Sequence, residues 1–119
     1  MSAVLSGSTV LVVEDEPFIA LDVAELLVTA GCRVLGPFGC LEEGLEAAEK
    51  GNFDLAVLDV KLRGAAVWPL AQLLRARGVP FVFLTGYSMI ENFEHVIRLD
   101  KPYEGWKVLD ALSQLRGGA

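Results

Sequence analysis

The sequence TVLVVEDEP, residues 9–17, runs from five apolar or β-branched residues into three adjacent carboxylates and a proline. An unbroken apolar run of this length is typical of a strand that is buried on both faces, as in a parallel sheet. Because proline suits the first turn of a helix, the acids lie where a strand gives way to a helix. Adjacent acids repel one another, so they either form a solvated surface or surround a bound positive charge.

The rest of the chain alternates short apolar runs with longer segments of helical period, the pattern of a parallel sheet covered by helices. Gly31, Gly51 and Gly78 each follow a helical segment, where helices commonly end. The expected strands are residues 9–13, 33–35, 55–58, 81–84 and 96–99, and the expected helices are residues 17–30, 41–50, 66–76, 88–94 and 104–115. This order predicts a doubly wound α/β domain with a five-stranded parallel sheet.

The composition favours one soluble domain. The 119 residues are 53% hydrophobic and carry a net charge of −6, so the chain can bury a core but lacks a broad positive surface. We therefore expect no nucleic-acid partner and no binding to anionic membranes. No apolar run approaches the roughly 20 residues that span a bilayer, and the first residues do not form a secretion signal. A cytoplasmic location is expected, with residues 1–7 and 117–119 as frayed ends.

Polar side chains follow four of the five expected strands, at the edge of an open α/β sheet where ligands bind. They are Glu14, Asp15 and Glu16 after the first strand, Asp59 after the third, Thr85 after the fourth, and Asp100 and Lys101 after the fifth. Their gathering at one edge favours the second interpretation of the acids at residues 14–16, in which they surround a cation.

The residue types at this edge predict which cation and which chemistry. Carboxylates without histidine or cysteine prefer a hard cation, and the acids lack the spacing of an EF-hand loop, so Mg2+ is expected rather than Ca2+. Asp59 could then attack a phosphorus centre and form an aspartyl phosphate. Thr85 could donate a hydrogen bond to a phosphoryl oxygen, and Lys101 could supply positive charge. Each residue also has a structural explanation: a helix cap, a strand end or a surface lysine.

With these residues in place, the chain resembles the receiver domain of bacterial two-component response regulators. The resemblance covers nearly the whole chain and is carried by VVEDEP, AVLDVKL, FLTGY and DKPY, in that order. It implies a flavodoxin-like fold with strand order 2-1-3-4-5 in a single stand-alone receiver domain, residues 1–119. The implied roles are Asp59 as phosphoacceptor, Asp15 as a direct Mg2+ ligand, Glu14 as a ligand through water, Lys61 as a ligand through its backbone carbonyl, Thr85 as the switch hydroxyl and Lys101 as the phosphate-binding residue.

The resemblance also implies a function. The domain would accept a phosphoryl group from a sensor histidine kinase or a phosphotransfer protein and signal to a downstream protein target, without turning over a separate substrate as an enzyme does. FLTGY is similar to the FAT GUY subclass of alphaproteobacteria, whose partners are often kinases of unusual type. One alternative is a pseudo-receiver, an interaction module without phosphotransfer. Another is a phosphatase, although that class places DxD after the first strand and this chain has EDE.

Three positions depart from the common receiver pattern. Arg63 stands where many receivers have proline, Gly86 follows the switch threonine in place of alanine or serine, and Leu99 replaces an aromatic residue two before the lysine. The phosphorylation chemistry does not depend on these positions. The usual signalling movement of an aromatic ring does, so a different route from the site to the surface is expected.

Overall fold

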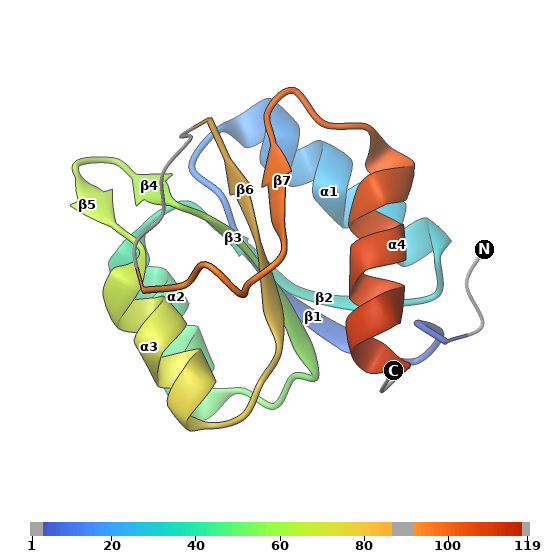
Figure 1. The fold of residues 1–119 in the computed structure, drawn as a ribbon, viewed down its shortest axis with the longest axis horizontal. Helices are drawn as coiled ribbons and strands as arrows, with labels where there is room; N and C mark the ends of the chain where they lie inside the picture. Colours follow the sequence, from blue (N-terminus) through green and yellow to red (C-terminus); the bar gives the residue numbers. More distant parts are fainter. Residues whose placement is uncertain (1–3, 87–91, 118–119) are drawn as a thin grey trace.

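Five parallel strands form the central sheet of the computed structural model, which describes residues 4–86 and 92–117 (Figure 1). The strands are β1 Thr9–Val13, β2 Arg33–Phe38, β3 Leu55–Asp59, β6 Phe81–Thr85 and β7 Arg98–Asp100, and the helices are α1 Pro17–Thr29, α2 Leu41–Lys50, α3 Trp68–Ala76 and α4 Gly105–Arg116. The sheet order is β2-β1-β3-β6-β7. Counting only these five strands along the chain, the order is 2-1-3-4-5, so the predicted topology is confirmed.

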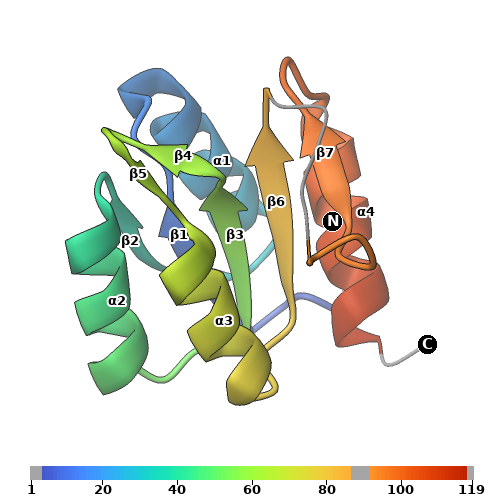
Figure 2. The ribbon, with the colours of Figure 1, turned by 60° about the vertical axis from the view of Figure 1, so that its left-hand side comes forward.

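Helices cover both faces of the sheet, with α1 and α4 on one side and α2 and α3 on the other (Figure 2). This sandwich explains the unbroken apolar run of β1. Val10 and Val12 pack toward α1 and α4, while Leu11 and Val13 pack toward α2 and α3. No helix within residues 4–86 and 92–117 is long and apolar enough to cross a membrane.

Two strands of the sheet differ from their predicted bounds by more than one residue at an end. β2 continues to Phe38, three residues beyond the predicted end, although it contains Gly36 and Pro37. An edge strand tolerates proline, and the β1–β2 pairing is irregular there. β7 begins at Arg98 rather than at residue 96, because the amide of Val96 closes a turn by donating to the Phe93 carbonyl at 3.0 Å.

A small antiparallel hairpin was not predicted. β4 Lys61–Leu62 pairs with β5 Ala65–Ala66 directly after β3, so α3 begins at Trp68 and not at residue 66. The two residues between the strands both have positive φ, 30° at Arg63 and 81° at Gly64. Such values are typical of the tight two-residue turns that join antiparallel strands. Because the hairpin follows the end of β3, it lies at the carboxyl edge of the sheet (Figure 2).

The helix predicted at residues 88–94 is not observed in the part of it that the structure describes. Residues 87–91 lie outside the described part of the chain, and residues 92–94 are not helical. Phe93 is buried, at 3% exposure, and its ring stacks on Trp68 of α3. At the other end of the chain, Leu5 is fully buried although residues 1–7 were expected to fray, because it packs into the core beside α1 and α4.

Candidate functional site: an acidic pocket at the carboxyl edge of the sheet

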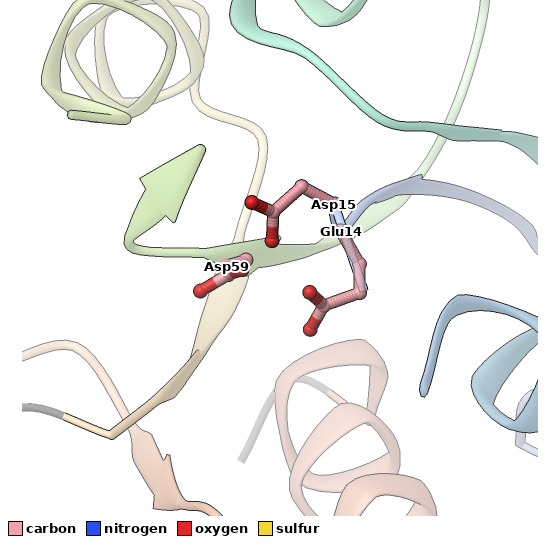
Figure 3. A group of neighbouring side chains, drawn as sticks. All are labelled: Glu14, Asp15 and Asp59. Carbon is pink, nitrogen blue, oxygen red and sulfur yellow. The ribbon is translucent and has the colours of Figure 1, made fainter. Parts of the chain in front are cut away.

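The carboxyl ends of the central strands bring three predicted acids together. Glu14 and Asp15 follow β1, and Asp59 is the last residue of β3, which pairs with β1. One carboxylate oxygen from each of the three residues can be chosen so that all three lie within 4.8 Å of one another (Figure 3). The parallel pairing of β1 with β3 therefore produces the acidic cluster that the sequence predicted.

Lys101 supplies the positive charge beside this cluster. Its Nζ lies 2.8 Å from Oε1 of Glu14 and 3.4 Å from Oδ2 of Asp59. Burial alone would lower the pKa of Lys101, but the two carboxylates outweigh it and raise the pKa. The lysine is thus held charged between the two most buried acids of the site, which are 2% exposed at Glu14 and 6% at Asp59.

The protonation of the acids is shaped by their crowding. Burial, hydrogen bonds with the Glu14 and Asp15 side chains, and repulsion from the charge of Glu14 raise the pKa of Asp59 to about 8, and Lys101 offsets only part of this. The pKa of Asp15 is lowered instead: burial acts against the charge, but hydrogen bonds from the Asp59 side chain and the Arg63 backbone outweigh it. The fold therefore disfavours the charged form of Asp59 and favours that of Asp15.

Backbone amides orient the carboxylates. Arg63 donates its amide to Asp15 Oδ2 at 3.1 Å, and Glu16 donates its amide to Glu14 Oε2 at 2.9 Å. The amide of Lys61 lies 3.4 Å from Asp59 Oδ1, while its side chain is exposed. The contribution of Arg63 was not predicted because it depends on the hairpin turn. The only local sign of that turn is Gly64, which adopts positive φ readily.

The remaining predicted residue, Thr85, ends β6 beside Asp59. Thr85 is fully buried, and its carbonyl accepts the amide of Lys101 at 2.9 Å. Leu84 pairs with Asp59 across the sheet, so Thr85 lies one residue beyond that pair. The structure thus brings together Glu14, Asp15, Asp59, Thr85 and Lys101, whereas it tests no role for the backbone carbonyl of Lys61.

The donor set fits magnesium. The pocket offers oxygen ligands only, two of the acids are buried, and one lysine is the only cation within ion-pair distance of the cluster among the described residues. The negative charge of three converging carboxylates exceeds the single positive charge of the lysine. A divalent cation would relieve the repulsion that remains among them. Glu14, Asp15 and Asp59 would hold it.

Fold and site together define a doubly wound α/β protein with an acidic pocket at the strand ends. Comparison with known proteins gives the family: the response regulator receiver domain matches residues 10–102. The chain belongs to the response regulator receiver domain family, which is a signalling family of two-component systems.

Individual relatives agree with this assignment. The transcriptional regulatory protein PdtaR of Mycobacterium tuberculosis is 36% identical over 86 residues, which cover 71% of this chain and 42% of PdtaR. The phyllosphere-induced regulator PhyR of Methylorubrum extorquens is 29% identical over 117 residues, which cover 91% of this chain and 43% of PhyR. The chain therefore spans less than half the length of these curated relatives.

Solved structures show the same fold over nearly the whole chain. SdrG from Sphingomonas melonis Fr1 superposes with a TM-score of 0.77 at 35% identity, covering 94% of this chain and 98% of SdrG. A response regulator receiver protein from Sinorhizobium medicae superposes with a TM-score of 0.84 at 25% identity, covering 95% of this chain and 97% of that protein. The flavodoxin-like receiver fold is thereby shown.

Proposed function

We propose that this receiver is a phosphorylation-dependent switch that accepts a phosphoryl group on Asp59 from a histidine kinase or a phosphotransfer protein. The observation that carries the proposal is the position of Asp59, at the end of the central strand, with Glu14 and Asp15 beside it and the Nζ of Lys101 3.4 Å away. A carboxylate among metal-binding acids and a lysine is arranged to react with a phosphoryl group rather than to cap a helix.

Each residue of the pocket has its own role in the proposed reaction. An Asp59 oxygen forms the new P–O bond while the bond from phosphorus to the donor nitrogen breaks and its electron pair returns to that nitrogen. Lys101 pairs with the added negative charge, and the Thr85 hydroxyl donates to a phosphoryl oxygen. Mg2+ held by Glu14, Asp15, Asp59 and the Lys61 carbonyl would neutralise charge on the phosphoryl oxygens. Asp59 reacts as the carboxylate, the form that the charge of Lys101, 3.4 Å away, favours.

The protein partner has a suitable surface beside the pocket. α1 begins directly after the acidic stretch, and three of its apolar side chains are exposed: Phe18 at 84%, Leu21 at 60% and Val28 at 62%. Apolar side chains exposed along one helix next to a reactive site are typical of a docking surface. We propose that the kinase or phosphotransfer protein contacts this face of α1.

Phosphorylation by a small-molecule donor tests the proposed function without a known kinase. The protein is incubated with acetyl phosphate and Mg2+, and its intact mass is measured before and after hydroxylamine. We expect one phosphoryl group that hydroxylamine removes, and none on Asp59→Asn, because only a carboxylate can form the acyl phosphate.

Asp110→Asn serves as the matched control, since Asp110 is an exposed aspartate on α4 outside the pocket. It should be labelled like the wild type. Equal labelling of Asp59→Asn would contradict the proposal. A folded wild type that is not labelled would favour the interaction module without phosphotransfer.

A further inference from the structure

One side-chain hydrogen bond ties the segment after β7 to α1. The hydroxyl of Tyr103 donates to Oδ2 of Asp22 at 2.9 Å, joining residues 81 positions apart. The Tyr103 ring packs against the core on the face that α1 and α4 cover. Burial, followed by the hydrogen bond to Asp22, raises the pKa of Tyr103, so the hydroxyl stays protonated and remains a donor. Tyr103 lies two residues after Lys101.

A second contact fixes the same segment one helical turn further along α1. A Cβ added at Gly105 would lie 2.9 Å from Leu26 Cδ1, so the first residue of α4 lies directly against α1. At its other end the segment is held by the Lys101 amide, which donates to the Thr85 carbonyl at 2.9 Å. Residues 101–105 therefore bridge β6 and α1.

This bridge fixes the backbone position from which the Lys101 side chain extends into the pocket. A lysine side chain has four rotatable bonds and keeps a fixed geometry only when its backbone and its partner are both held. The Nζ of Lys101 lies 2.8 Å from Glu14 Oε1, and Glu14 is itself held by the Glu16 amide. The backbone of Lys101 is held on one side by Thr85 and on the other, through residue 102, by Tyr103.

We propose that Tyr103 is a positioning residue, whose hydrogen bond to Asp22 holds Lys101 where it contacts the phosphoryl group on Asp59. The inference rests on the proposed function and deepens it. It also makes α1, the helix proposed to meet the phosphodonor protein, part of the support of the phosphate-binding lysine.

The variant Tyr103→Phe removes the hydroxyl and keeps the ring. We expect phosphorylation by acetyl phosphate to slow by about threefold to tenfold, the range that one lost hydrogen bond gives. The affinity for beryllofluoride in the presence of Mg2+ should fall by a similar factor. The affinity for Mg2+ alone should change by less than about twofold, since the metal-binding acids keep their own contacts. A general loss of structure would weaken all three measurements together.

Combining Tyr103→Phe with Lys101→Ala distinguishes a positioning role of Tyr103 from a structural one. In a Lys101→Ala background, Tyr103→Phe should have no further effect on the phosphorylation rate, because the group that it positions is gone. A rate reduced by the same factor in both backgrounds would overturn the inference. Asp22→Asn keeps an oxygen acceptor for the Tyr103 hydroxyl and should retain more activity than Asp22→Ala.

Trp106→Phe is the matched control. It removes another hydrogen bond from an aromatic donor to a carboxylate, the 2.8 Å bond from Trp106 Nε1 to Glu104 Oε2, at the same end of α4 but without a link to α1. It should be phosphorylated at the wild-type rate. Tyr103→Phe at the wild-type rate would overturn the inference.

The ammonium NMR signal of Lys101 tests positioning without phosphorylation. The close ion pair with Glu14 slows proton exchange at Nζ, so we expect faster exchange in Tyr103→Phe than in the wild type or Trp106→Phe. An unchanged signal would contradict the positioning role. If the wild type is not phosphorylated but the signal responds as expected, the proposed function fails while the link from Tyr103 to Lys101 stands.

Discussion

Asp59 is a buried carboxyl whose charge the fold disfavours, and this has a consequence for stability. Its pKa is about 8 in the folded protein against an ordinary value of 3.8. Between these two pH values the folded protein holds a proton that the unfolded chain releases. The contribution of Asp59 to the free energy of unfolding therefore falls as the pH rises from about 4 to about 8. A carboxyl with a lowered pKa would have the opposite effect.

Asp59→Asn removes this titration. We expect the variant to be more stable than the wild type at pH 8–9 by about 1–3 kcal/mol and nearly equal to it at pH 4, where Asp59 is neutral. Urea unfolding at several pH values, with EDTA present, measures the difference. Added Mg2+ should narrow it, because the cation stabilises the wild-type carboxylate. A difference that does not vary with pH would show that Asp59 is ionised throughout.

Asp15 allows a test of the proposed metal site, because it is the acid of the cluster whose pKa is lowered and which is already charged at neutral pH. Asp15→Asn should weaken Mg2+ binding by at least about tenfold, since a neutral amide replaces a charged ligand. Titration calorimetry measures this directly. Asp22→Asn, which changes an acid on α1, should leave the affinity within about twofold. An Asp15→Asn protein with the wild-type affinity would remove Asp15 from the ligand set.

At the scale of elements, the β4–β5 hairpin stabilises the site through its turn. Gly64 has φ of 81°, where an added Cβ meets no atom within 4 Å but the backbone is strained for other residues. Gly64→Ala should lower the free energy of unfolding by about 1 kcal/mol. It should also weaken Mg2+ binding modestly, because the neighbouring Arg63 amide orients Asp15.

Gly39→Ala is the control for this prediction. Gly39 also has open space around its Cβ position, but its φ lies outside the strained positive range. We expect a change in stability of about zero or a gain of up to about 1 kcal/mol, because alanine restricts the unfolded chain. Equal destabilisation by the two substitutions, measured by urea unfolding, would show that the positive φ of Gly64 is not the cause.

Elements with a strong local signal could be predicted from the sequence, and elements made by tertiary pairing could not. β1 and β3 are continuous apolar runs, and the acids after them converge because the strands are parallel neighbours. The hairpin at residues 61–66 consists of two short strands, too brief to show any periodicity. The hydrogen bond between the Tyr103 and Asp22 side chains joins two polar residues 81 positions apart, and no sequence pattern marks such a pair.

At the scale of the whole molecule, an aromatic cluster connects the end of β6 to α3 and to Phe93. Phe83, two residues before Thr85 on β6, makes an edge contact with Trp68 at 5.9 Å between ring centroids. Trp68 stacks on Phe93 at 5.6 Å, and the guanidinium of Arg75 lies 4.4 Å from the Phe93 ring. This cluster lies on the α2–α3 face, whereas Leu99, which replaces the usual aromatic residue, packs on the α1–α4 face.

This arrangement predicts that Trp68 senses occupation of the site. A phosphoryl group on Asp59 would draw the Thr85 hydroxyl toward it, and a movement at the end of β6 is transmitted to Phe83 and its partner rings. Trp106→Phe leaves Trp68 as the single tryptophan of the chain, which has two. We expect its fluorescence to change on addition of beryllofluoride with Mg2+, to saturate with binding, and to stay constant when Asp59→Asn is also present.

The complementary variant, Trp68→Phe, reports from Trp106, which is 60% exposed on α4 and lies outside the aromatic cluster. Its emission should change much less under the same conditions. Fluorine NMR on both variants establishes that beryllofluoride is bound. Bound ligand with constant Trp68 emission would mean that the signal leaves the pocket by another route, and a larger response at Trp106 would direct attention to the segment that joins Lys101 to α4.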